Sequence, residues 1–228
     1  PGMKALVLLL NLLTLSWALP ALAADAAARV AELEGRAIAL GTDGHSRTLG
    51  IDSLLYAGDT VATLGRARAL LLFTDDSRYE LGADTRLRID RYRYGGAPEE
   101  AESATAVVKG LFRFVSGLIA KSRPRATVIR TNVATIGIRG THIVGEVTET
   151  SATIGLLPPE SGAAPNAIEV SNAHGSVVID KPNYVTEVPD ADSPPTPPRP
   201  RDLRTMTRNL RLVQTMRRVI TPRMPGLP

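Results

Sequence analysis

Short apolar runs, each ended by a turn signal, follow one another along most of the chain. In residues 86–92, Leu87 and Ile89 alternate with Arg86 and Arg88, which is the pattern of a strand with one buried face. Many such runs at close spacing predict an all-β domain. The expected strands cover residues 36–40, 54–56, 60–63, 69–73, 78–81, 86–92, 106–110, 111–115, 127–130, 168–170 and 176–179, with a strand pair in 148–157.

Glycine or aspartate stands at the corners between many of these runs, for example at Gly65 and Gly110. This arrangement favours stacked short strands, either β-solenoid-like or as a two-sheet sandwich, over a closed barrel of long strands. No exact repeat period separates the two alternatives. Residues 95–104 and 158–165 are rich in loop-forming residues and predict exposed loops.

The stretch from Val133 to Val144 is the most structured part of the pattern. Ile136 and Ile138 alternate with glycines, as on one face of a strand. We expect Gly137 and Gly140 to mark bends where φ is positive or another backbone lies close. Arg139, which lies just before Gly140, either donates to several carbonyls and ties neighbouring turns together or is an ordinary exposed arginine.

The N-terminal residues have the features of a secretory signal peptide. Pro1 and Gly2 precede the first methionine and are left out of the interpretation. Lys4 is followed by an uncharged apolar run over residues 5–19 and by the small-x-small triplet Ala21-Leu22-Ala23. This pattern predicts export and cleavage after Ala23, with a periplasmic or secreted product. The alternative is an uncleaved anchor, because the apolar run approaches the ~20 residues that span a membrane.

The remaining residues predict one domain followed by a tail. Residues 24–188 are expected to form the domain, with a core at 33–180 and an alanine-rich lead-in at 24–33 that is either a short helix or frayed chain. They hold 18 Lys and Arg against 20 Asp and Glu, a net charge of −2. The chain contains no cysteine, so the domain depends on its apolar core and offers no thiolate metal site.

The last part of the chain differs in composition. Residues 189–200 are rich in proline and predict a stiff extended spacer. Residues 201–228 predict a basic amphipathic helix, which lies on an anionic membrane, contacts an acidic partner, or packs its apolar side on the β domain. Its apolar positions are Leu203, Met206, Leu210, Val213, Met216 and Ile220, and the candidate interaction residues between them are Arg204, Arg208, Arg211 and Arg218.

No pattern predicts catalysis. His45, His142 and His174 are far apart in sequence, so separate turn histidines are a better interpretation than a metal site. Asp75 and Asp76 resemble a paired carboxylate or calcium site, although adjacent aspartates at a strand end are usually a solvated turn. Neither a G-x-S-x-G elbow nor a phosphate-binding loop occurs. We therefore predict no catalytic, cofactor-binding or metal-binding residue, and a protein that is not an enzyme.

A basic segment offers a second class of function. Arg86, Arg88, Arg91 and Arg93 are interleaved with Tyr92 and Tyr94, as in some proteins that bind single-stranded nucleic acid. The same residues also make an ordinary outward strand face, and the export signal argues against nucleic acid as the ligand. The alternative function is binding of an envelope surface or a polyanion, such as a polysaccharide, an anionic lipid or a nucleic acid, through arginines.

Six motifs in order resemble the FecR domain family. Residues 55–63 are similar to its L-x-x-G-D-x-V-x-T segment, and residues 136–141, I-G-I-R-G-T, are similar to its hallmark. Asp76 stands where the family has a glycine, and His142 stands where it more often has an acidic residue. The signature residues carried by these motifs are Gly58, Asp59, Asp75, Ser77, Gly110, Arg113, Gly137, Arg139, Gly140, Thr141 and Gly175.

The resemblance implies an all-β periplasmic module of the cell envelope that senses a signal or contacts a protein. It implies structural roles for the signature residues and an unidentified envelope protein as partner. The cytoplasmic segment that holds a sigma factor in the regulators of this family has no counterpart in the sequence, so we expect a stand-alone exported form without anti-sigma activity. The tail arginines are expected to contact an anionic membrane surface or the partner.

Overall fold

Nearly every described segment of the chain is a strand, as the sequence predicted. The computed structural model describes residues 25–140, 142–159 and 167–210. The signal segment 1–23, Thr141 and residues 211–228 lie outside the described residues. No helix in the described part of the chain combines the length and the apolar character needed to cross a membrane.

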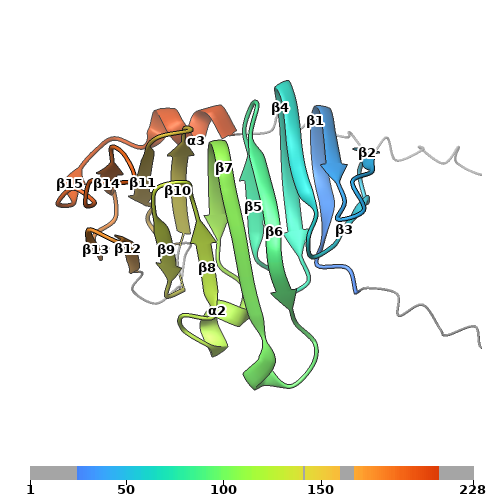
Figure 1. Ribbon diagram of the computed structural model, residues 1–228, viewed down its shortest axis with the longest axis horizontal. Coiled ribbons are helices and arrows are strands. Elements are labelled where there is room, and N and C mark those ends of the chain that lie inside the picture. The colour runs from blue at the N-terminus through green and yellow to red at the C-terminus, as the bar shows by residue number, and fades with distance from the viewer. Residues whose placement is uncertain (1–24, 141, 160–166, 211–228) are drawn as a thin grey trace, which may run out of the picture.

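The described strands all belong to one hydrogen-bonded network (Figure 1). They are β1 (Ala28–Leu40), β2 (Ser46–Leu49), β3 (Leu54–Leu55), β4 (Thr60–Phe73), β5 (Arg78–Leu81), β6 (Arg86–Arg93), β7 (Glu102–Val115), β8 (Thr127–Arg130), β9 (Thr135–Ile138), β10 (His142–Val147), β11 (Ala152–Leu156), β12 (Ile168–Asn172), β13 (Gly175–Ile179), β14 (Tyr184–Val188) and β15 (Arg199–Pro200). The short helices are η1 (Pro98–Glu100), α2 (Leu118–Ser122) and α3 (Arg204–Leu210).

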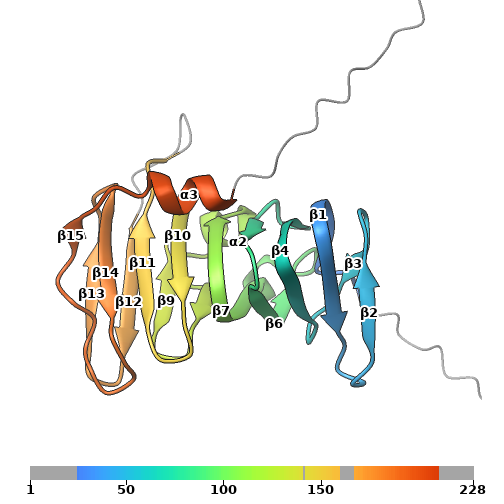
Figure 2. The same cartoon turned by 90° about the horizontal axis from the view of Figure 1, so that it is seen from above.

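The network folds into two packed sheets because three long strands change sheet halfway along (Figure 2). The first half of β7 pairs with β6 and β8, and its second half pairs with β5 and β10. Strands β1 and β4 also change partners midway. Sheet I therefore has the order β2-β1-β4-β6-β7-β8-β9-β12-β13, and sheet II has the order β3-β1-β4-β5-β7-β10-β11-β14-β15. Of the two expected architectures, the structure is therefore the two-sheet sandwich and not the β-solenoid-like stack.

Glycines with positive φ lie where the long strands change sheet. Gly110 in β7 has φ +107°, and the corresponding glycines of β1 and β4 are Gly35 and Gly65. A glycine bends a strand here without the steric cost of a side chain. The prediction that strands end at Gly65 and Gly110 was wrong, because both residues bend a strand whose pairing resumes in the other sheet.

The core lies between the two sheets and is built from the inward positions of every long strand. An aromatic cluster marks its centre. The ring of Tyr79 lies 4.7 Å from that of Phe114 and 5.6 Å from that of Phe73, measured between centroids. Tilted rings at these separations add attraction beyond their buried area. Strand alternation predicted which residues point inward, but not that two sheets would share this cluster.

The start of the domain corrects two expectations. Strand β1 begins at Ala28, so the lead-in predicted as a short helix or frayed chain is a paired strand, with Ala28 and Val30 buried. The predicted loop 95–104 is shorter than expected, because β7 starts at Glu102. The start of β1 is a strand because it pairs with β4, and the start of β7 is a strand because it pairs with β6. The alanine-rich and acidic compositions of these segments do not favour strands by themselves.

The proline-rich segment is attached to the domain. Thr196 donates its backbone N–H to the Glu187 carbonyl at 2.9 Å, and its own carbonyl accepts a 2.7 Å bond from the Thr186 hydroxyl. Strand β15 then pairs with β14 at the edge of sheet II. The segment predicted as a free spacer therefore covers this edge, where its prolines offer no N–H groups for further pairing.

Helix α3 packs its apolar side on the outer face of sheet II (Figure 2). Leu203 and Leu210 are buried beside Val144 and Val185. The Nε of Arg68 donates to the Asn209 carbonyl at 2.9 Å. The tail was expected to lie on a membrane, contact an acidic partner or pack on the β domain. Residues 203–210 pack on the β domain. Arg204 and Arg208 remain exposed, while Arg211 and Arg218 lie outside the described residues.

The change of sheet at Gly110 predicts a large stability effect. A Cβ at this position would lie 2.3 Å from the Thr85 Oγ1 and 2.5 Å from the Thr85 Cα, in addition to the strained φ. Gly110→Ala should therefore lower the free energy of unfolding by about 3–5 kcal/mol. Gly65→Ala is the matched control, because no atom lies within 4 Å of its added Cβ, and it should cost about 1–2 kcal/mol. Urea unfolding measures both, and equal losses would contradict the role of Gly110.

Candidate functional site

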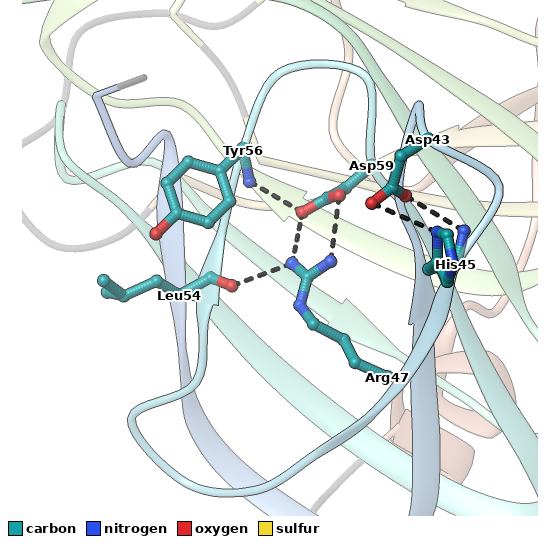
Figure 3. Close-up of polar contacts among 6 residues, drawn as sticks. All are labelled: Asp43, His45, Arg47, Leu54, Tyr56 and Asp59. Carbon is teal, nitrogen blue, oxygen red and sulfur yellow. Dashed lines mark hydrogen bonds and ion pairs between the residues drawn. The ribbon is translucent and has the colours of Figure 1, made fainter. Parts of the chain in front are cut away.

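Asp59 of the Gly58-Asp59 motif forms a partly buried ion pair with Arg47 (Figure 3). The Asp59 side chain is 5% exposed and accepts hydrogen bonds from Arg47 Nη1 at 3.1 Å and Nη2 at 2.5 Å. It also accepts the Tyr56 N–H at 2.8 Å, while Arg47 Nη2 donates to the Leu54 carbonyl at 3.0 Å. The motif thus closes the turn before β4 and attaches β2 to it.

The electrostatics of this end follow from the same contacts. The hydrogen bonds to Asp59 hold the pKa of the Arg47 guanidinium above its ordinary value. Nearby, the backbone N–H of His45 donates to Asp43 at 2.9 Å and lowers the pKa of that carboxyl (Figure 3). The His45 side chain is exposed. His45 is therefore a turn residue, and Arg47 is the structural cation that sequence reasoning missed, because its partner lies in the following turn.

The Asp75 to Ser77 turn anchors helix α2. Asp75 is buried, and its Oδ1 accepts bonds from the Ser77 hydroxyl at 2.6 Å and the Tyr92 hydroxyl at 3.1 Å. Its Oδ2 accepts the N–H of Ile119 at 3.3 Å. Asp76 has φ +65° and is exposed. The two carboxylates therefore do not form a paired site: one anchors the turn, and the other takes the left-handed position that aspartate tolerates.

A polar network crosses the outer face of sheet II. Arg113 Nη1 donates to Glu80 Oε1 at 2.9 Å, and Arg113 Nε donates to His142 Nε2. The other ring nitrogen of His142 lies 3.0 Å from the Pro158 carbonyl, which assigns the ring proton to Nδ1. His142 is therefore a buried neutral link between β7, β10 and the segment after β11.

The I-G-I-R-G-T segment is less buried at its arginine than expected. Gly140 has φ +66°, but Gly137 lies inside β9 without positive φ, and the nearest atom to its added Cβ is 3.9 Å away. The Arg139 side chain is 47% exposed and lies 3.8 Å from a Glu169 oxygen. Arg139 is therefore an exposed arginine and does not tie neighbouring turns together. Its partner is a surface carboxylate, Glu169 of the neighbouring strand β12, and not a set of buried carbonyls. Thr141 lies outside the described residues.

Gly175 lies in the turn between β12 and β13. The His174 N–H donates to the Asn172 side chain at 2.9 Å, and Asn172 Nδ2 donates to the Ser193 carbonyl at 2.7 Å. A Cβ on Gly175 would lie 3.2 Å from Pro194 Cβ. The residue therefore leaves room for the proline-rich segment to pack on this turn.

The described signature residues do not meet in one pocket. Most lie at separate turns and sheet changes, while Gly137 lies within β9 and Arg113 within the second half of β7. Among residues 25–140, 142–159 and 167–210, no group of three His, Asp or Glu side chains is arranged to hold a metal ion. The buried signature residues Asp59 and Asp75 stabilise turns, and Gly110 allows the bend in β7.

The basic segment of β6 is arranged differently from a stacking surface. Tyr92 points inward, and its ring lies 5.3 Å from that of Phe73. Arg93 Nη2 donates to Glu102 at 2.7 Å, directly across the β6–β7 pair. The parallel pairing of β7 with β8 brings Arg123, Arg125 and Arg130 beside this strand. No local pattern indicates this, because the pairing joins segments that are distant in sequence. The arginines thus form a joint surface from which Tyr92 is turned away, while Tyr94 is 38% exposed just beyond the end of β6.

Comparisons with known proteins find a family model that matches part of the chain. Residues 59–157 match the family model described as FecR protein. None of the curated proteins matches the chain. Two crystal structures of a proposed anti-sigma factor from Parabacteroides distasonis have 13% identity to it and a TM-score of 0.49; each match covers 65% of this chain and 62%, less than two thirds, of the solved one. A cell surface anchoring domain has 24% identity and a TM-score of 0.27 over 27% of this chain and 82% of that domain.

The Asp59 ion pair predicts an asymmetric effect of arginine substitutions. Arg47→Met leaves a buried carboxylate without its cation and should lower the free energy of unfolding by about 1–3 kcal/mol, less than for a fully buried pair because Arg47 is partly exposed. Arg29→Met, which removes an exposed 3.0 Å pair with Asp52, should cost about 0.5 kcal/mol or less. Thermal and urea unfolding test the difference, and equal effects would contradict the role of Arg47.

The buried tyrosines predict a dependence on alkaline pH. Burial raises the pKa of the Tyr79 and Tyr92 phenols above the ordinary value of about 10. The folded state therefore holds these protons more tightly than the unfolded chain, so this contribution to stability is complete below about pH 10 and declines as pH rises above it. Phenolate absorbance should show that two of the five tyrosines ionise only on unfolding. Tyr92→Phe should leave one, and simultaneous ionisation of all five would contradict the assignment.

Proposed function

We propose, on the match of residues 59–157 to the family model described as FecR protein, that this chain contains a FecR domain and that the protein is a non-enzymatic regulatory domain of the bacterial cell envelope. In this proposal it is exported to the periplasm and acts by contact with another protein. The family match is the observation that carries the proposal.

The roles of the signature residues support a binding function. Asp59 and Asp75 are buried and fully engaged in turns, and Gly110 serves the change of sheet. Groups that are already paired in this way stabilise a rigid body and are not exposed to a ligand. A partner must then be recognised by the outer faces of the two sheets.

A hollow on the outer face of sheet II suits such a contact. It measures about 330 Å³ and lies beside the start of α2. Leu118, which is 41% exposed, lines it together with Leu72 and Val115, and the charged lining residues are Arg78, Lys121 and Asp76, a net charge of +1. Exposed apolar residues next to cations favour a protein partner that presents an apolar side chain flanked by acidic ones.

Export is supported by the sequence. Lys4, the apolar run at 5–19 and the A-x-A triplet before Ala24 have the order of a cleavable signal peptide. The compartment and the protein partner are tested by separate experiments.

Site-specific photo-crosslinking tests the contact. A photo-reactive residue at Leu118, in the full chain expressed in a bacterial cell, should yield a specific crosslink to an envelope protein, and Leu118→Asp should weaken capture of that protein at least about tenfold. The matched position is Val178, which is 54% exposed on β13 and should give no such product. Crosslinks of equal strength at both positions, or none at Leu118, would contradict the proposed surface.

The same cells report the compartment. Fractionation should place the protein in the periplasm, with Ala24 as the N-terminal residue of the mature chain. A cytoplasmic protein that retains Lys4 would contradict export while leaving the crosslinking result independent.

A further inference from the structure

The outer face of sheet I carries a row of arginines. Leu87 and Ile89 point into the core, so Arg86 and Arg88 point outward from β6. A bulge follows Ile89 and shifts the register by one residue. Its effect is that Arg91 and Arg93 project from the same face as the first two, while Tyr92 turns inward.

A second set of arginines lies beside this row. Strand β8 runs parallel to β7, which places Arg130 3.6 Å from Asp90 of β6. The chain before β8 places Arg123 and Arg125 around a hollow of about 350 Å³ that Arg91 and Arg93 also line. We call this surface the arginine face; its members are Arg86, Arg88, Arg91, Arg93, Arg123, Arg125 and Arg130.

The carboxylates on the arginine face are too few to neutralise its arginines. Asp90 is shared by Arg88 and Arg130. Glu102 is shared by Arg91 at 3.6 Å and Arg93 at 2.7 Å. Within the described part of the chain, Arg86 and Arg125 have no carboxylate partner. The seven arginines face four carboxylates, Asp90, Glu99, Glu100 and Glu102, which leaves a net charge of 7 − 4 = +3.

The shape of the arginine face favours an elongated ligand. A second hollow of about 430 Å³ lies at the other end of the β6 row, beside Arg86 and Arg88. Its floor includes Ile38, Leu40 and Val108, which suit the C–H faces of sugar rings. Cations in line between two hollows fit a chain that carries a negative charge at regular intervals.

Two other polyanions fit this surface less well. Single-stranded nucleic acid is bound with bases stacked on several aromatic rings, but Tyr92 is packed against Phe73, which leaves Tyr94, 38% exposed just beyond the end of β6, as the one ring of this segment that is open to stacking. A flat anionic membrane would approach the acidic side chains of Glu99 and Glu100 at the rim of the first hollow. A narrow chain can instead lie along β6 without contacting that rim.

We propose that the arginine face binds a carboxylate-bearing polysaccharide, with the chain lying along β6 and its carboxylates paired with arginines. This function is tested separately from the protein contact at Leu118, because the hollows on the two surfaces are lined by different residues. Binding is electrostatic in the main and weakens as salt screens the charges.

Affinity measurements with polygalacturonate test the proposal. The full chain should bind it at low salt, bind neutral dextran at least about tenfold more weakly, and lose affinity as sodium chloride is raised. Arg86→Gln with Arg125→Asn should weaken polygalacturonate binding about tenfold, since both arginines are exposed and the asparagine tolerates the φ of +83° at position 125.

The matched control removes the same charge from the other sheet. Arg29→Gln with Arg208→Gln lowers the net charge equally and should change the affinity less than about twofold. Circular dichroism of each variant confirms that it is folded. Equal losses in both double variants, absence of binding, or tighter binding to a single-stranded oligonucleotide or to phosphatidylglycerol vesicles would overturn the proposal. Loss of polysaccharide binding with an unchanged Leu118 crosslink separates this function from the proposed protein contact.

Discussion

The passage of three long strands from one sheet to the other is the constraint on which the structure depends. Strands β1, β4 and β7 contribute to both sheets, so the two layers are joined by continuous backbone as well as by the core between them. Each passage requires a sharp bend within a paired strand, and at Gly110 the Thr85 backbone leaves no space for a side chain. A sandwich joined in this way holds its outer faces in a defined relation over its whole length.

The polar signature residues serve this framework. Asp59 closes the turn before β4, and Asp75 connects the next turn to α2 and to Tyr92 of β6. Both carboxylates are buried, so each must be satisfied by nearby donors or the fold loses more than one hydrogen bond. Both residues lie within the segment 59–157 that matches the FecR model.

The outer faces differ in what they offer to other molecules. Sheet II carries α3 over one part and a hollow beside Leu118 over another. Sheet I carries the arginine face, whose carboxylates are too few to neutralise it. A rigid body with an apolar contact on one side and a cationic one on the other is suited to connecting a protein with a charged polymer, which accords with both proposals for an envelope domain.

Local patterns in the sequence determined the strand class, most strand positions, the turns at Gly58-Asp59 and Asp75-Ser77, and the family resemblance, because alternation and turn chemistry act between neighbours. They also predicted φ > 0 at Gly140. Tertiary structure alone decided that β4 and β7 run on through their glycines, that Arg139 is exposed while Arg47 is engaged, and that Arg130 joins the arginines of β6. It also turned the proline-rich segment and Leu210 into parts of the packed domain. Each of these outcomes depends on contacts between residues distant in sequence, whose pairing is set by how two sheets bury their faces together.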